Sequence, residues 1–362
     1  MTFITGMLLI DAPASALNNS GEGIANARTD NTVSVKSIRT RRGEMYPYVT
    51  AQAVRYWLRA TLENSAEIEW QSSPVYREEK VAYTDANPIL YWDDDLLGYM
   101  RAPSKRKKAD KDDAAFAALT PMEEDEKGNP KPVTRAAPMR VSTFVSIAPV
   151  NITADFGVMA RHDGDPAPYE HEFYRAMLHG LFSIDLGMAG KFFYRRRTGF
   201  QNLDAVRVQQ AIENGLEHLE SERAYRLSQG ERIRRVQSLL YGMARLQGGA
   251  KQTLHYTDVT PAVTIIGFTK GGNHPFNYLF AEKNGAPYFD KDVFEKAVTD
   301  ARNDLVEGSP ICIGWKHGFL PEERAKVEQL GIEGVNIWFG TPREAFGWAA
   351  AWLGENPAQW DK

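Results

Sequence analysis

The first residues of the chain place the strongest constraint on its fold. Thr2 to Asp11 is a short run of β-branched and large apolar residues that ends at Ala12-Pro13. Such a run predicts a buried β-strand. Asn31 to Arg39 alternates apolar and polar residues, as a half-exposed strand does. The same criteria predict further strands at 140–150, 182–186, 263–268 and 311–315.

A first helix is predicted directly after Thr50, whose side chain is suited to cap a helix that runs to about Glu63. Its apolar residues recur at helical spacing and form one stripe. Gln52, Arg55 and Arg59 follow each other at spacings of three and four residues, so they share the opposite, polar face.

Further helices are predicted downstream. Thr341-Pro342-Arg343-Glu344 combines a capping box with proline at the first helical position and begins a helix to Leu353. Helical patterns also cover 168–181 and 203–247. Strands and helices in this order, interrupted by large insertions, predict one α+β domain over 1–362 rather than a doubly wound α/β fold.

Three segments are interpreted as insertions. The segment 93–138 contains a run of basic residues, a run of acidic residues and several prolines, and part of it is expected to be mobile. The segment 187–202 is expected to be a protruding hairpin, because glycines flank its aromatic and basic residues. The segment 271–310 is a further insertion.

The distribution of charge along the chain is uneven. The 362 residues carry a formal net charge of −4, which excludes a protein that binds nucleic acid through bulk positive charge. Three segments, 28–59, 191–207 and 223–251, carry +5, +4 and +6. This segregation favours a positive groove for a polyanion. The alternative is three separate solvated faces.

One motif favours nucleic acid, and a second is compatible with it. Tyr194-Arg195-Arg196-Arg197-Thr198-Gly199-Phe200 combines guanidiniums, which pair with phosphate, with aromatic rings that can stack on bases. Leu246-Gln247-Gly248-Gly249-Ala250-Lys251-Gln252-Thr253 is not a Walker loop, because Ala250 precedes the lysine and a helix comes before the motif. Its glycines either let backbone amides approach a phosphate or ribose, or form a helix C-cap.

Catalytic and metal-binding patterns are missing from the sequence. The seven histidines never form His-Glu-x-x-His, and no Gly-x-Ser-x-Gly elbow occurs. Cys312, the single cysteine, is interpreted as a buried strand residue, and Asp93-Asp94-Asp95 as acids at a helix N-terminus. We therefore expect no enzyme, no cofactor and no metal. Without a signal peptide or an apolar run of membrane-spanning length, a cytoplasmic protein is expected.

Several stretches together resemble the DevR-type backbone subunit of CRISPR Cascade complexes, most closely that of type I-B, within the RAMP superfamily. The resemblance rests on 5–13, 17–19, 28–31, 48–59, 140–142, 173–186, 248–253 and 258–261. These stretches occur in the family's order and span most of residues 1–270. The segment 93–138 and the residues after Gly271 match weakly.

The resemblance implies a modified ferredoxin-like or RRM-like palm with fingers at 93–138 and a thumb hairpin at 187–202. Such subunits polymerise head to tail along the spacer of a guide RNA (crRNA) and present it to target DNA. The other partners implied are the large subunit, the RAMP subunit at the crRNA 5′ end and the crRNA-processing endoribonuclease. The residues expected to bind RNA are Asn19, Arg28, Lys36, Arg39, Gln52, Arg55, Arg59, Arg140, Ser142, Lys191, Arg195, Arg196, Arg197, Gly249, Lys251 and Gln252.

Two alternatives stay open. A guide-processing endoribonuclease of the same superfamily would usually carry a general-base histidine and a basic glycine-rich loop near the C-terminus, and neither is found. A transcriptional autoregulator would be expected to have a DNA-reading helix and two-fold symmetry, and the sequence has no helix-turn-helix pattern.

Overall fold

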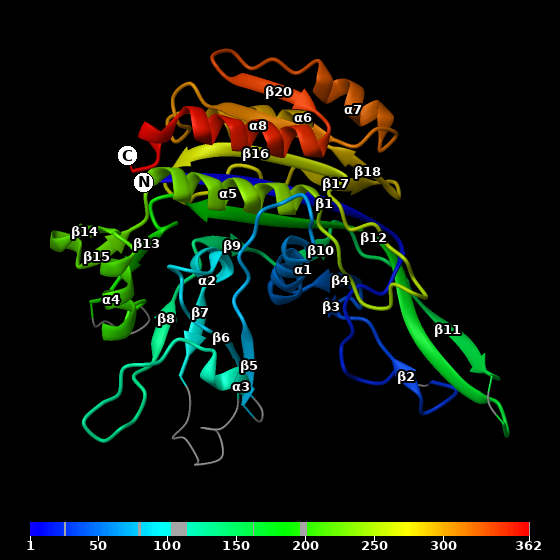
Figure 1. The fold of residues 1–362 in the computed structure, drawn as a ribbon. Helices are drawn as coiled ribbons and strands as arrows, with labels where there is room; N and C mark the ends of the chain where they lie inside the picture. Colours follow the sequence, from blue (N-terminus) through cyan, green and yellow to red (C-terminus); the bar gives the residue numbers. More distant parts are fainter. Residues whose placement is uncertain (25–26, 79–80, 103–113, 162, 196–200, 362) are drawn as a thin grey trace.

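The computed structural model describes residues 1–24, 27–78, 81–102, 114–161, 163–195 and 201–361. An eleven-stranded mixed sheet forms its centre (Figure 1). Along the sheet the strands follow the order β20 (Asn336–Gly340), β19 (Pro310–Trp315), β16 (Val263–Lys270), β1 (Thr2–Ser15), β12 (Ala167–Asp185), β10 (Phe144–Ser146), β4 (Met45–Val49) and β3 (Ser37–Arg39). Three more strands pair with β12: β11 (Ile152–Met159), β2 (Thr32–Val33) and β9 (Met139–Val141).

Strand β1 lies in the middle of this sheet and separates two hydrophobic cores. Ile4 and Leu8 face one core, whereas Met7 and Leu9 face the other, as alternation along a strand requires. The first core is covered by α1 (Ala51–Glu63), α5 (Gln229–Ala244) and α8 (Pro342–Glu355). The second core is covered by β17 (Phe280–Lys283), β18 (Ala286–Phe289), α6 (Lys291–Asp300) and α7 (Pro321–Glu328).

The remaining elements form smaller units beside the large sheet (Figure 1). A three-stranded sheet contains β13 (Lys191–Phe193), β15 (Ala224–Arg226) and β14 (Glu217–Leu219), next to α4 (Ala205–Glu213) and the 3₁₀ turn η2 (Glu220–Glu222). Two hairpin pairs are β5 (Val75–Glu78) with β6 (Val81–Thr84), and β7 (Tyr99–Arg101) with β8 (Val133–Arg135). The short helices are α2 (Trp92–Leu97), α3 (Ala114–Ala117) and η3 (Pro357–Gln359).

The elements with strong local signals are confirmed. Thr50 caps α1, which ends at Glu63, and the capping box of Thr341 and Glu344 opens α8. The predicted strands at 263–268 and 311–315 are β16 and β19. The predicted strands at 31–39 and 140–150 are each broken into two short ones. No helix in the described part of the chain is long and apolar enough to span a membrane.

The predicted helix at 168–181 is wrong, because these residues belong to the nineteen-residue strand β12. Tyr174, Ala176 and Leu178 are buried in the first core, and the residues between them are more exposed. This alternation has a period of two. Pairing with β1 on one edge and β11 on the other fixes the strand, because long-range pairing outweighs local propensity.

The hairpin predicted at 187–202 stays a prediction, because residues 196–200 lie outside the described residues. At its base the Asn202 amide donates to the Phe193 carbonyl at 2.8 Å. The strand of this segment, β13, pairs with β15 at 224–226. A hairpin that projects from the body is formed by β11 and the first half of β12 (Figure 1). We call this hairpin, residues 152–174, the arm. The predicted helical segment at 203–247 contains two helices separated by β14, η2 and β15.

The segments interpreted as insertions are partly integrated into the fold. Within 93–138, Asp93, Asp94 and Asp95 are completely buried in α2, and β7 pairs with β8. The segment 271–310 contributes β17, β18 and α6 to the second core. The α+β class is confirmed by this large mixed sheet and its covering helices.

Candidate nucleic-acid interface

The glycine-containing loop after α5 is held tightly against α1. A Cβ atom on Gly248 would lie 2.2 Å from the Trp57 ring, and one on Gly249 would lie 2.6 Å from Leu17. Both glycines have positive φ angles, +157° and +107°. Helix α5 ends with its C-cap at Arg245, so the interpretation of Gly248 as a C-cap is wrong. Gly248 instead allows the loop to approach α1 closely, and Gly249 allows it to approach Leu17.

Hydrogen bonds fix the shape of this loop. The amide of Ala250 donates to the Leu17 carbonyl at 3.0 Å. The side chain of Gln252 accepts a hydrogen bond from the Thr257 amide at 3.0 Å and donates to the Gly248 carbonyl. Gln252 therefore serves the loop itself. Lys251 has a positive φ of 52° and makes no ion pair with a carboxylate in the described residues, which leaves its ammonium available.

The same loop contacts the base of the arm. The His255 ring lies 4.8 Å from the His171 ring, centroid to centroid, and stacks on Phe173 at 5.0 Å. Burial lowers the pKa of both histidines, and the nearby Lys251 ammonium lowers them further. This cluster was not predicted, since only the strand topology brings 171 and 255 together.

A second predicted segment reaches the base of the arm from elsewhere in the chain. The Arg28 amide donates to the Glu170 carboxylate at 2.9 Å, and the Val35 amide donates to Glu172 at 2.9 Å. The Arg28 guanidinium lies 5.9 Å from the Phe156 ring. Within the described residues, three predicted cations of this segment form no ion pair: Arg28, Lys36 and Arg39. Asn19 is exposed and forms a β-bridge with Val35.

The polar face of α1 is partly occupied by internal partners. Gln52 is exposed. Arg55 donates to the Met139 carbonyl at 3.0 Å, and burial lowers its pKa. Arg59 forms an ion pair with Asp93 at 3.0 Å. These two arginines therefore have structural partners, so their positive charge is less available to a ligand than the sequence implied.

Arg140 and Ser142 lie on β9 and just beyond it. The Arg140 guanidinium is 5.6 Å from the Phe3 ring. The Ser142 hydroxyl accepts a hydrogen bond from the Leu181 amide at 2.8 Å and donates to the Thr143 carbonyl at 3.1 Å. Ser142 thus anchors its segment to β12. Of the two residues only Arg140 carries a charge, and it forms no ion pair within the described residues.

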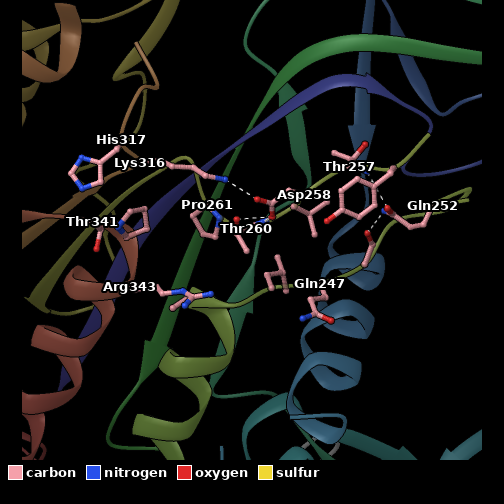
Figure 2. A pocket seen from close by; sticks show the side chains of 16 residues that line it. Gln247, Gln252, Thr257, Asp258, Thr260, Pro261, Lys316, His317, Thr341 and Arg343 are labelled. Carbon is pink, nitrogen blue, oxygen red and sulfur yellow. Dashed lines mark hydrogen bonds and ion pairs between the residues drawn. The ribbon is translucent and has the colours of Figure 1, made fainter. Parts of the chain in front are cut away.

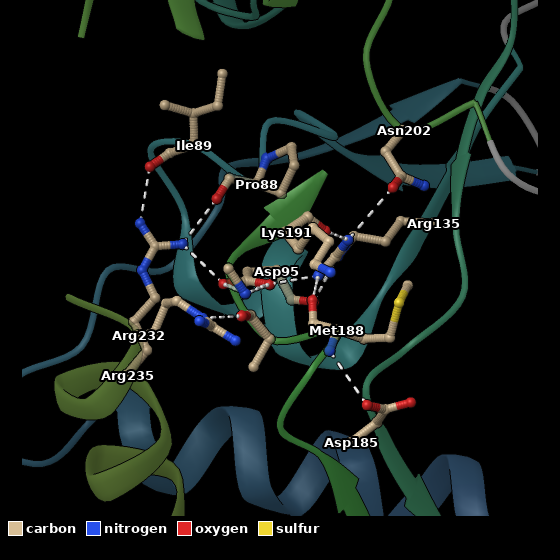
Figure 3. Close-up of polar contacts among 12 residues, drawn as sticks. Pro88, Ile89, Asp95, Arg135, Asp185, Met188, Lys191, Asn202, Arg232 and Arg235 are labelled. Atoms are coloured by element: carbon tan, nitrogen blue, oxygen red, sulfur yellow. Dashed lines mark hydrogen bonds and ion pairs between the residues drawn. The ribbon is translucent and has the colours of Figure 1, made fainter. Parts of the chain in front are cut away.

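The basic segment at 223–251 is divided, because two of its arginines lie in the protein interior. Arg232 and Arg235 are almost fully buried and hold the helix α5 in place through a polar network (Figure 3). Arg235 pairs with Asp95 at 3.0 Å, and Arg232 pairs with Asp361 at 2.9 Å. Arg135 also binds Asp95, at 2.6 Å. These charges stabilise the fold.

Of the four cations predicted in the thumb, two lie within the described residues. Lys191 pairs with Glu222 at 3.1 Å. The Arg195 guanidinium lies over the Phe193 ring at 4.5 Å. Arg196 and Arg197 lie outside the described residues.

A large cavity of about 940 Å³ adjoins the loop (Figure 2). Gly248 and Gln252 line it together with His317 and Arg343. Its rim also carries an internal ion pair between Lys316 and Asp258 at 2.7 Å. In the described residues no group of three or more His, Cys, Asp or Glu side chains is arranged to hold a metal.

The structure is that of a mixed α+β protein with a projecting arm. Cations that form no ion pair within the described residues lie at the base of this arm. A family model described as "CRISPR-associated negative auto-regulator DevR/Csa2" matches residues 9–291. The chain therefore belongs to the DevR/Csa2 family. No curated protein matches it.

Two solved structures are similar to the chain. A chain of a "CRISPR RNA-guided surveillance complex, pre-nicking" has a TM-score of 0.53 and 10% identity, over 96% of this chain and 99% of that one. A chain of another "CRISPR RNA-guided surveillance complex" is 9% identical with a TM-score of 0.49, over 97% of this chain and 99% of that one. The first likeness supports a shared overall fold.

Proposed function

We propose that this protein is a non-catalytic backbone subunit of a CRISPR Cascade complex, which binds guide RNA through its phosphates. The observation that carries the proposal is the gathering of cations around the base of the arm. Arg28, Lys36 and Lys251 come from two distant segments, and both segments contact β12 within residues 170–173. Cations without carboxylate partners suit a polyanion.

Phosphate contacts suit this function for a physical reason. A guide must be held whatever its sequence, and its base edges must stay free to pair with target DNA. Cations and backbone amides meet both requirements because they bind the strand without recognising the bases. The large sheet would act as the RRM-like palm, and 93–138 as the fingers.

Beside the segment 187–202, the arm is proposed as an element that acts as a thumb. It projects from the body (Figure 1), and Phe156, Val158 and Met159 are exposed on it. A two-stranded ribbon with exposed apolar side chains has little stability alone, so we expect it to contact a second copy and the RNA there. A head-to-tail contact of this kind is heterologous and builds a filament.

Charge reversal tests the proposed interface. Lys251→Glu and Arg28→Glu should each weaken binding of an oligoribonucleotide about tenfold, with the fold unchanged. Lys296→Glu is the matched control, because Lys296 is an exposed lysine on α6, the helix that covers the second core. This variant should leave the affinity unchanged. Equal effects at all three positions would contradict the proposed site.

Two other functions are outcomes of further tests. The family description includes negative auto-regulation, so a footprint of the pure protein on its own promoter would favour a transcriptional regulator. Cleavage of repeat RNA by the pure protein would favour a guide-processing endoribonuclease. The proposed backbone function predicts neither result.

A further inference from the structure

Four aromatic rings join the loop after α5 to the base of the arm. Three of them, Tyr169, His171 and Phe173, alternate along β12 and therefore point to one face of the strand. The Tyr169 ring stacks on the His171 ring at 5.6 Å. The fourth ring, His255 of the loop, contacts both His171 and Phe173, at 4.8 Å and 5.0 Å between centroids. His255 thus connects the loop that carries Lys251 with the arm.

The two imidazoles of this group have hydrogen-bonding capacity that the chain does not use. Both ring nitrogens of His171 and Nε2 of His255 are buried and have no hydrogen-bond partner within the described residues. Asp155 on β11 is paired in register with His171. Its carboxylate lies 3.7 Å from Nε2 of His171, which is too long for a hydrogen bond but close enough for an ion pair. A positively charged His171 would therefore have a partner on the neighbouring strand.

Two opposite charges act on the protonation of both imidazoles. Burial lowers the pKa of each ring, the Lys251 ammonium lowers it further, and the Asp155 carboxylate raises it. For His171 the neighbouring imidazole adds to the lowering. The adjacent acids on β12, Glu170 and Glu172, point to the other face of the strand and accept backbone amides there. Without a ligand at Lys251, both rings are therefore neutral at pH 7.

A phosphate bound at Lys251 would reverse this balance. Its negative charge offsets the ammonium that opposes protonation, and it stands near the same two imidazoles. A charge that favours the protonated ring is in turn bound more tightly by that ring, because linkage is reciprocal. Binding of a polyanion and uptake of a proton should therefore support each other at the base of the arm.

From this arrangement we infer that His171 and His255 are positioning residues, which together take up one proton from solvent when an RNA phosphate binds Lys251. The imidazolium then pairs with Asp155 and holds the loop, β12 and β11 together. This inference rests on the proposed function and deepens it, because it links RNA binding at the loop to the position of the arm. RNA should accordingly bind more tightly as the pH falls.

The pH dependence of RNA binding tests the inference. The full chain is titrated with oligouridylate that carries no terminal phosphate, since a phosphate monoester has a pKa of about 6 and would itself titrate. We expect the affinity to rise about three- to tenfold as the pH falls from about 7.5 to about 5.5. Calorimetry in two buffers of different ionisation enthalpy should show that protons are taken up on binding.

Two variants assign the proton to this group. The double variant His171→Phe and His255→Phe keeps aromatic rings at both positions but cannot bind a proton, so its affinity should change less than about twofold over this range. Asp155→Asn removes only a carboxylate whose side chain is 57% exposed, and it should reduce the rise in affinity. His218→Gln is the matched control, because His218 also stacks on an aromatic ring, Tyr225 at 4.8 Å, but lies on β14. This variant should keep the full rise.

The possible results separate the inference from the proposed function. An RNA affinity that stays constant with pH, or protons released on binding, would overturn the inference and leave the proposed function standing. A full rise in affinity in the double variant or in Asp155→Asn would also overturn it, since the proton would then bind elsewhere. An unmodified chain that binds no RNA at any pH in this range would overturn the proposed function itself.

Discussion

Arg235 on α5 and Asp95 on α2 are 140 residues apart in the sequence, yet Arg235 Nη1 lies 3.0 Å from the Asp95 carboxylate. Asp95 also accepts hydrogen bonds from Arg135 and from the Gly190 amide (Figure 3). All three side chains are buried. One carboxylate therefore joins α2, β8, α5 and the segment before β13.

Asp95→Asn should destabilise the protein strongly. The substitution leaves the buried Arg135 without a counter-charge, and the buried Arg235 keeps only Glu231, at 2.9 Å. Removing one partner of a buried ion pair costs about 3–5 kcal/mol. Urea denaturation measures this loss. Glu69→Gln is the control, because Glu69 meets Arg234 at 3.7 Å on the surface, where an ion pair contributes about 0–1 kcal/mol. Similar losses for both variants would contradict the role given to Asp95.

Asp94, the next residue, should make stability depend on pH in the opposite direction to a salt-bridged acid. Burial and the neighbouring Asp93 raise its pKa from 3.8 to about 7. The folded state then binds a proton that the unfolded state releases, so this contribution is present below pH 4 and is lost as pH rises towards 7. Relative to Asp94→Asn, the unmodified protein should lose stability over this range by up to about 1.4 kcal/mol per pH unit. A difference in unfolding free energy between the two proteins that stays constant from pH 4 to pH 7 would contradict this prediction.

The sequence predicted elements whose signals are local. Thr50 caps α1, and Thr341 with Glu344 opens α8, because a cap needs only neighbouring residues. The larger part of β12, 168–181, was mistaken for a helix because its conformation depends on β1 and β11, which lie elsewhere in the chain. The end of the strand, 182–185, was predicted as a strand. The alternation of Tyr174, Ala176 and Leu178 with other residues is the period-two sequence signal that favours a strand here.

The candidate site was predictable only in part. Counting charges along the chain could not separate Arg235, which is buried beside Asp95, from Lys251, which has no carboxylate partner in the described residues. Both belong to one basic segment. The contact between His171 and His255 depends on the path of the loop over the arm, and no local pattern encodes it.

Gly248→Ala should weaken the binding of RNA. The new methyl group would collide with the Trp57 ring, so the loop that presents Lys251 must move. We expect a loss of about tenfold or more in RNA affinity, measured by fluorescence anisotropy. Gly347→Ala in α8 is the control, since a Cβ there has nothing within 4 Å and alanine favours helix. Equal affinity for the two variants would show that the loop does not position a binding residue.

Guide binding should tolerate changes of sequence and weaken steeply with salt. If each subunit neutralises about 3–4 phosphates, log K should fall with log salt concentration at a slope of about −2 to −3 per subunit. Titrations of two unrelated RNA sequences at several KCl concentrations measure this slope. An affinity that does not change with salt would contradict a phosphate-binding interface.

The most direct test of the backbone function is sedimentation of the pure protein with RNA strands of increasing length. A head-to-tail subunit should form particles whose number of copies rises in proportion to RNA length, because each added segment of RNA supplies one more binding site. Removing the tip of the arm, 156–168, should abolish this growth while a single copy still binds. A constant number of copies at every RNA length would contradict the account.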